Sequence, residues 1–245
     1  MNCEIIVIDD CSERPVILDG AIVIRNLRKL GSGESRNIGC RHAKSDWLLL
    51  VDDDLIPSSG LTHWIQAHLP ILDPRDIVGF RIAGFNNMGS STVTYRYTTI
   101  SRILNIVFGI DVSTHEGPSR FIPSAMIFNA KFFASLGGFD SRRYGGNGFR
   151  EESDLQWRAR KLGGRLTLIK DPFFNHLNII GGHEKRFITN NIYFMRNQTI
   201  FALRTGSPAA LVMISGFGGY LLAKGVRIST LVKGVALGVM MALKG

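Results

Sequence analysis

The feature that most constrains the fold is an apolar run, Trp47–Val51, followed directly by Asp52, Asp53 and Asp54. A run rich in leucine and valine predicts a buried strand of an α/β sheet. The acids therefore follow the end of a strand, where α/β proteins bind their ligands. Adjacent carboxylates repel one another, and a bound divalent cation offsets that cost. The triplet indicates a metal site, and the alternative is an acidic start to a helix near Pro57.

The N-terminal region repeats this pattern. The β-branched run Glu4–Ile8 predicts a strand, and Asp9 and Asp10 follow it. Further along the chain, the glycine-rich segment Gly31–Gly39 precedes or opens a predicted helix. Glycines before a helix can hold a phosphate, and Arg36 can add a charge-assisted hydrogen bond. Alone this loop is weak evidence, because Gly-Ser-Gly is more often a turn.

A third acidic motif lies in Gly148–Arg158, which begins with acids and continues with basic and aromatic residues. Acids at a helix start and arginines in later turns complement the helix dipole. Glu151, Glu152 and Asp154 cannot all serve that purpose on one face, because consecutive helical positions turn by about 100°. One of these acids is therefore expected to point into a cleft.

In this order the motifs resemble the family 2 glycosyltransferases of GT-A fold. The resemblance covers roughly residues 3–205 and rests on Glu4–Ser12, Gly33–Gly39, Asp52–Asp54, Gly137–Asp140 and Glu151–Leu155. It implies a Rossmann-like α/β fold with a mixed, mainly parallel sheet, flanking helices and a C-terminal apolar helical appendage. It also implies an inverting, single-displacement transfer of a hexosyl or deoxyhexosyl group from a nucleotide-sugar donor to a glycan or lipid-linked acceptor, as in polysaccharide biosynthesis.

The resemblance assigns roles residue by residue. Asp10 is expected to contact the nucleobase and Arg36 to line the nucleotide. Asp52 and Asp54 bracket the DxD motif. Asp52 and Asp53 are expected on the donor side, with Asp52 at the ribose or at a metal-bound water. The cation, Mn²⁺ or Mg²⁺, would be bound by Asp54, Asp52 and His176, with Asp54 as the direct ligand.

The catalytic base is expected at the start of the third motif. Glu152 occupies the position of the family's aspartate, which takes the proton from the acceptor hydroxyl. Glutamate is one methylene longer than the family's residue, so Glu151 is a rival for the same role. Asp154 is expected to cap or brace the helix.

The resemblance also divides the chain into two parts. Residues 1–205 correspond to the GT-A-like domain, and 206–245 to membrane-associating or packing helices. The family normally opens with one more strand than this sequence shows, so we expect part of the nucleobase wall to be missing. The expected strands are near 4–9, 21–25, 47–52, 76–83, 121–128 and 165–169, and the expected helices near 34–44, 59–71, 130–136, 151–162 and 183–205.

Charge and composition suggest a location. The net charge is +9, yet there is no motif typical of nucleic-acid binding, so an anionic membrane surface is the favoured partner. The C-terminal third carries two apolar segments interrupted by glycines and flanked by basic residues, as expected for helices lying in the interface. Three cysteines without metal-site spacing suggest reduced thiols. The expected location is the cytoplasmic side of the cell membrane, peripherally bound.

Two other functions fit parts of the sequence. A sugar-phosphate nucleotidyltransferase would also place acids and a metal beside a nucleotide, but its glycine-rich loop should follow the first strand and carry a lysine. A non-catalytic membrane-surface scaffold descended from the family would explain the missing strand. Hydrolysis of a donor in the presence of Mn²⁺ would separate an enzyme from a scaffold.

Overall fold

The computed structural model describes residues 3–84, 116–146, 148–177, 191–206 and 210–243. The chain forms two compact units. The first unit comprises residues 1–5, 42–138 and 156–180, and the second comprises residues 6–41, 139–155 and 181–245. The C-terminal helices share the second unit with the N-terminal strands, and the predicted division at residue 205 stays a prediction.

The first unit is built on a six-stranded sheet in the order β3-β7-β5-β8-β4, with β6 also paired to β8. Its strands are β3 (Trp47–Leu50), β4 (Leu55–Pro57), β5 (Asp76–Gly84), β6 (Gly117–Pro118), β7 (Met126–Asn129) and β8 (Arg165–His176). The longest pairing, β5 with β8, is parallel, whereas the shorter pairings are antiparallel. The sheet is mixed, as predicted, and parallel along its longest pairing.

Helices α2 (Leu61–His68) and α4 (Ala130–Ser135) and the 3₁₀ turn η1 (Leu69–Ile71) complete this unit, together with the second part of α6 (Glu151–Lys161). Apolar side chains from the strands and α2 form the core. Its buried members are Leu55, Leu61, Ile65, Val78, Phe80, Ala125, Ile127, Ile169 and Phe174. This core fixes the ends of the strands at which the acids lie.

The helix expected near 59–71 is present as α2 and η1, and the segment before it, Leu55–Pro57, pairs with β8 as strand β4. One of the strands, β8, differs from its expected bounds. Strand β8 extends to His176, well past the expected end at residue 169. The register on β5 jumps from Ile169 to Phe173, so the residues between them, Pro172 included, form a bulge. A bulge accommodates a proline that an unbroken central strand would exclude.

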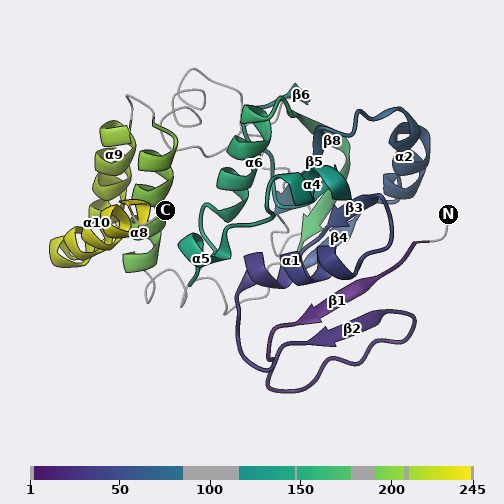
Figure 1. The fold of residues 1–245 in the computed structure, drawn as a ribbon, viewed down its shortest axis with the longest axis horizontal. Helices are drawn as coiled ribbons and strands as arrows, with labels where there is room; N and C mark the ends of the chain where they lie inside the picture. The colour runs from purple at the N-terminus through teal and green to yellow at the C-terminus, as the bar shows by residue number, and fades with distance from the viewer. Residues whose placement is uncertain (1–2, 85–115, 147, 178–190, 207–209, 244–245) are drawn as a thin grey trace. The chain divides into compact units, whose positions relative to one another are not determined.

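The second unit begins with β1 (Ile6–Asp9) and β2 (Ile22–Arg25), which pair in parallel in a separate two-stranded sheet (Figure 1). Helix α1 (Ser32–His42) follows them. A Cβ atom added at Gly39 would lie 3.5 Å from Cγ1 of Ile8, so α1 packs closely on β1. The acids after β1 therefore lie in a different unit from the acids after β3.

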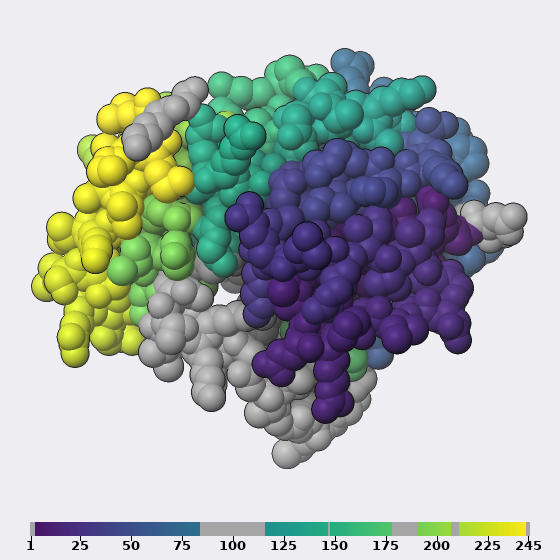
Figure 2. All heavy atoms as spheres, turned by 60° about the horizontal axis from the view of Figure 1, so that its bottom comes forward, coloured from purple at the N-terminus to yellow at the C-terminus, as the bar shows by residue number. Residues whose placement is uncertain are grey.

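The rest of the second unit is helical. It contains α5 (Ser141–Tyr144), the first part of α6, α8 (Asn191–Arg204), α9 (Ala210–Ala223) and α10 (Ile228–Leu243). Both α9 and α10 pack against α8. In Figure 2 the colour of these three helices runs from green at α8 to yellow at α10. Within the described residues, each helix falls short of the length and apolar character needed to cross a membrane.

Candidate functional site

The acidic triplet lies in the connection between β3 and β4. Asp52 is half-buried, and its Oδ2 accepts a hydrogen bond of 2.7 Å from Ser124 Oγ. Asp53 is exposed to solvent. The structure thus places the triplet at the end of a strand, as the sequence predicted.

The third acid is paired with a histidine from a distant part of the chain. Leu55 lies opposite His176 in the pairing of β4 with β8, and the N–H of Leu177 donates to the carbonyl of Asp54 at 2.7 Å. This pairing brings Nε2 of His176 to 3.2 Å from Oδ2 of Asp54. The strand pairing therefore joins two of the three predicted metal ligands.

The Asp54–His176 pair fits a divalent cation in two respects. Carboxylate oxygen and imidazole nitrogen are both ligands for Mn²⁺. Neighbouring ligands of an octahedral ion, each about 2.1 Å from it, are about 3 Å apart, close to the observed 3.2 Å. Among the described residues, no three His, Cys, Asp or Glu side chains gather closely enough to hold a metal ion alone. A cation bound here would therefore need further ligands from the substrate.

Asp9, the last residue of β1, and Asp10, which follows it, are engaged by the chain itself. Asp9 is buried and accepts hydrogen bonds from the backbone N–H groups of Ser12 and Val16 and from Arg25. These bonds, led by that from the Ser12 backbone, lower the pKa of Asp9 below its ordinary value. Asp9 therefore fixes the loop after β1.

Asp10 plays a similar part at the start of α1. Its carboxylate accepts hydrogen bonds from the N–H groups of Leu30 and Gly31, at 2.8 and 2.9 Å, and from the Asn26 amide at 2.9 Å. Partial burial acts to raise the pKa of Asp10, but these bonds outweigh it, and the pKa is lowered. The carboxylate thus holds the loop that leads into α1, and its predicted contact with a nucleobase stays a prediction.

Glu151 is the more buried of the two adjacent glutamates that begin α6. Its side chain is buried, with 2% of the residue exposed, and Oε2 accepts a hydrogen bond of 3.1 Å from Ser32 Oγ in α1. A Cβ atom at Gly33 would lie 2.7 Å from this carboxylate, so a larger residue there would have to displace it. Burial raises the pKa of Glu151 to about 7, and the charge of Glu152 adds to the shift.

Glu152 has a different environment. Its side chain is 27% exposed, and Oε1 accepts a hydrogen bond of 2.5 Å from Nη1 of Arg36 in α1. The guanidinium of Arg36 also lies 5.5 Å from the ring centroid of Phe139. The structure therefore brings together two predicted site residues, Arg36 and Glu152, and leaves Glu152 the more accessible of the two glutamates.

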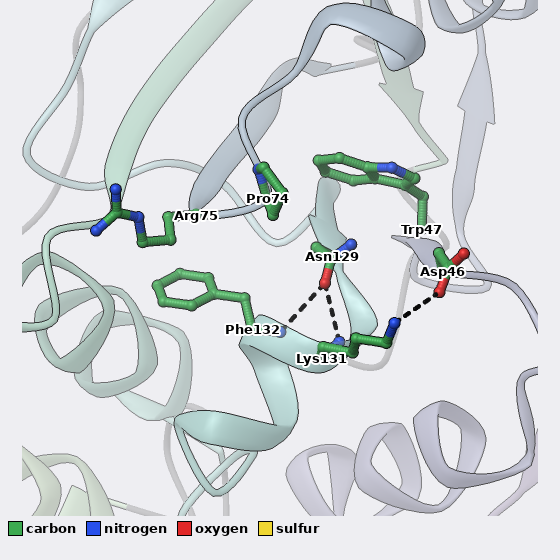
Figure 3. Close-up of a pocket in the computed structure, with 7 residues that line it drawn as sticks. All are labelled: Asp46, Trp47, Pro74, Arg75, Asn129, Lys131 and Phe132. Carbon is green, nitrogen blue, oxygen red and sulfur yellow. Dashed lines mark hydrogen bonds and ion pairs between the residues drawn. The ribbon is translucent and has the colours of Figure 1, made fainter.

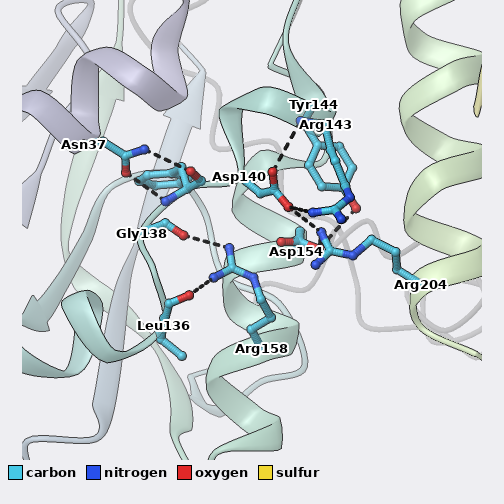
Figure 4. A network of polar contacts seen from close by, with 10 residues as sticks. Asn37, Leu136, Gly138, Asp140, Arg143, Tyr144, Asp154, Arg158 and Arg204 are labelled. Atoms are coloured by element: carbon cyan, nitrogen blue, oxygen red, sulfur yellow. Dashed lines mark hydrogen bonds and ion pairs between the residues drawn. The ribbon is translucent and has the colours of Figure 1, made fainter. Parts of the chain in front are cut away.

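A network of charged and polar side chains supports the start of α6 (Figure 4). Arg204 of α8 forms ion pairs with Asp140 at 2.9 Å and with Asp154 at 2.8 Å. The hydroxyl of Tyr144 donates to Asp154 at 3.2 Å. Asp154 is fully buried and braces the helix, as predicted. Sequence reasoning did not find Arg204 as its partner, because α8 lies about 50 residues further along the chain.

A surface pocket also lies in the first unit (Figure 3). Its lining residues are Asp46, Trp47, Pro74, Arg75, Asn129, Lys131 and Phe132. Trp47 begins β3, whereas the acidic triplet follows the other end of that strand. None of the predicted site residues lines this pocket.

Comparison with known proteins identifies the family. The sequence profile described as "Glycosyl transferase family 2" matches residues 1–136, more than half of the chain. A pre-mycofactocin glycosyltransferase of Mycobacterium tuberculosis is 27% identical over 236 residues, which cover 86% of this chain and 45% of that protein. An uncharacterized glycosyltransferase of Haemophilus influenzae is 47% identical over 58 residues, covering 22% of this chain and 20% of that protein. This chain thus spans less than half the length of either relative.

Solved structures share the fold at low sequence identity. S. aureus TarS 1-349 in complex with UDP-GlcNAc matches with a TM-score of 0.55 and 16% identity, covering 82% of this chain and 56% of that one. The mannosyltransferase PcManGT from Pyrobaculum calidifontis, in complex with GDP-Man and Mn²⁺, matches with a TM-score of 0.54 and 14% identity, covering 98% and 77%. The predicted GT-A fold is confirmed, and the chain belongs to glycosyl transferase family 2.

Proposed function

We propose that this chain transfers a sugar from a nucleoside-diphosphate donor to a hydroxyl acceptor, with inversion at the sugar carbon. The observation that carries the proposal is the Asp54–His176 pair, whose 3.2 Å spacing matches two neighbouring ligands of one divalent cation. The ligands missing from this pair are the kind that a donor diphosphate provides. TarS and PcManGT, which share the fold, were crystallised with nucleotide sugars, and the PcManGT complex also contains Mn²⁺.

The cation would be held by Asp54 and His176. Asp52 lies two residues before Asp54 in the sequence. When bound, Mn²⁺ or Mg²⁺ supplies positive charge that offsets the charge developing on the leaving diphosphate. Ser124 fixes one oxygen of Asp52 through its 2.7 Å hydrogen bond, so Asp52 is oriented before the donor arrives. Such orientation lowers the cost of binding.

Glu152 is the residue that we assign as the general base. In the transfer step the acceptor hydroxyl gives its proton to Glu152, its oxygen bonds to the anomeric carbon, and the bond from that carbon to the diphosphate breaks. A base must meet the incoming acceptor, and Glu152 is 27% exposed whereas Glu151 is buried. The Arg36 contact uses Oε1, and a carboxylate has acceptor sites on both oxygens.

Glu151 then acts as a positioning residue. Its hydrogen bond with Ser32 ties the start of α6 to the start of α1, the helix that carries Arg36. Its pKa of about 7 keeps it near half-protonated at neutral pH, and this value also suits a general base. Exposure is the observation that favours Glu152 over Glu151 as the base.

The test is a mass-spectrometric screen of nucleotide sugars against glycan and lipid-linked acceptors, with Mn²⁺ and with the chelator EDTA. We expect one donor to be consumed, with release of its nucleoside diphosphate, and the reaction to stop in EDTA. A chain that binds nucleotide sugars yet consumes none with any acceptor would be a scaffold. Release of inorganic pyrophosphate from a nucleoside triphosphate and a sugar phosphate would instead indicate a nucleotidyltransferase.

A further inference from the structure

The outer face of α10 is apolar and exposed to solvent. Its side chains follow one another at helical spacing, and four of them are Ile228, Val232, Met240 and Leu243, with 67, 62, 52 and 81% exposed. An ordinary water-facing helix surface carries charged residues instead. We call these four residues the α10 apolar face.

The opposite side of α10 packs tightly on α8, which fixes the apolar face outward. A Cβ atom at Gly234 would lie 2.7 Å from Cβ of Met195, and one at Gly238 would lie 2.6 Å from Cβ of Thr199. These glycines allow the helix backbones to approach closely, as small residues do wherever helices pack. Rotation of α10 to bury its apolar face would therefore bring larger side chains into α8.

Helix α9 adds exposed apolar surface to the same unit. Leu211, Val212 and Leu222 are 74, 55 and 44% exposed, and α9 contains no charged residue. Leu211 and Leu222 are eleven residues apart and lie on one side of the helix, because eleven residues complete about three turns. Both C-terminal helices thus present apolar side chains to solvent.

The charge around these helices has one sign. Residues 185–245 contain eight lysines and arginines and no aspartate or glutamate. Lys224, Arg227 and Lys233, which lie between α9 and α10 or on α10, are exposed. A partner surface that matches them must combine negative charge with an apolar layer, and an anionic bilayer has both.

We propose that α10, assisted by α9, binds the surface of an anionic lipid bilayer through the α10 apolar face. One side of the helix packs on α8 and the other side is apolar and exposed, so the helix lies in the plane of the membrane. The neighbouring basic side chains reach the lipid phosphates. Each basic residue near an anionic surface strengthens binding about fivefold.

Vesicle flotation of the full chain tests this proposal without reference to transferase activity. The probes are vesicles of phosphatidylcholine alone and of phosphatidylcholine mixed with phosphatidylglycerol, at low and high salt. We expect the protein to float with the anionic vesicles at low salt and to bind the neutral vesicles far less. Failure to float with anionic vesicles at low salt overturns the proposal.

A matched pair of variants locates the surface. Ile228→Glu puts a charge into the α10 apolar face at the first residue of the helix, where an acid suits the helix dipole. Ile71→Glu makes the same change at a position that is 78% exposed in the first unit. We expect Ile228→Glu to weaken flotation at least about tenfold, and Ile71→Glu to leave it unchanged. Equal binding by both variants contradicts the assignment of this face.

Analytical ultracentrifugation separates a bilayer from a second copy of the chain as the partner. We expect the wild-type chain and Ile228→Glu to have the same mass in the absence of vesicles. A wild-type dimer that Ile228→Glu converts to monomers, with no flotation by either protein, would assign the face to a protein interface and overturn the proposal.

Discussion

The ends of β1 and β3 look alike in the sequence and differ in the structure. Each strand is apolar and is followed by adjacent aspartates. After β1, backbone N–H groups and the side chains of Arg25 and Asn26 surround Asp9 and Asp10. After β3, Asp53 is exposed, and Asp54 contacts His176, a residue type that commonly binds metal ions.

The difference separates an acidic strand end that stabilises its own loop from one that is open to a ligand. A carboxylate that accepts several hydrogen bonds from its own chain stabilises a loop, because its acceptor sites are occupied. A carboxylate with a polar partner and access to solvent can exchange that partner for a ligand. The two glutamates of α6 repeat this contrast, because Glu151 is buried against α1 whereas Glu152 is accessible.

The largest effect is expected from Glu152→Gln. The amide keeps the shape of the side chain and cannot accept a proton, so transfer should fall roughly 10²–10⁴-fold while donor binding is kept. Steady-state kinetics and donor affinity measured on the same preparation check this. Near-normal turnover in Glu152→Gln, together with an inactive Glu151→Gln, would move the base to the buried position.

The next effect is on stability and concerns Glu151. Its pKa of about 7 lies above its ordinary value of 4.5, so between these values the folded chain binds more protons than the unfolded chain. The free energy of unfolding should therefore decrease as the pH rises from 4.5 to 7, by roughly 1–3 kcal/mol. Urea denaturation at pH 5 and pH 8 measures this slope. Glu151→Gln should flatten it, and an unchanged slope would show that Glu151 is not responsible.

The smallest effect is the expected difference in stability between Asp10→Ala and Asp54→Ala. Asp10→Ala leaves the N–H groups of Leu30 and Gly31 without their carboxylate acceptor, so the free energy of unfolding should fall by about 1–2 kcal/mol. Asp54→Ala should change it by no more than about 0.5 kcal/mol, because this residue lies at a solvent-accessible strand end. Chemical denaturation of both variants at one pH checks the difference. A larger loss in Asp54→Ala would reverse the comparison.

Local patterns in the sequence were enough to predict many of the strands and helices. The strands at Ile6–Asp9, Trp47–Leu50 and Asp76–Gly84 follow from their apolar and β-branched runs. The helices at Ser32–His42 and Glu151–Lys161 lie where the glycine-rich and acidic motifs predicted them. These signals are short-range, so they do not depend on which strands pair.

The parts of the fold and site that the sequence did not predict depend on contacts between distant residues. Strand β4 exists because Leu55–Pro57 pairs with Phe174–His176, and nothing within Leu55–Pro57 itself indicates this. The extension of β8 past Pro172 depends on a bulge opposite β5. The motifs identified the two glutamates but did not predict that Glu151 is buried and Glu152 accessible. This difference in burial arises from the packing of Ser32 and Gly33 against Glu151.

Calorimetry of nucleoside-diphosphate binding in the presence of Mn²⁺ tests most directly whether the end of β3 is the binding end. Asp54→Ala should weaken this binding at least about 100-fold, because it removes a direct ligand. Asp46→Ala, at the opposite end of β3 and 77% exposed, is the matched control and should bind as the wild-type chain does. Unchanged affinity in Asp54→Ala would contradict the metal-binding role of Asp54 and, with it, the distinction drawn between the two strand ends.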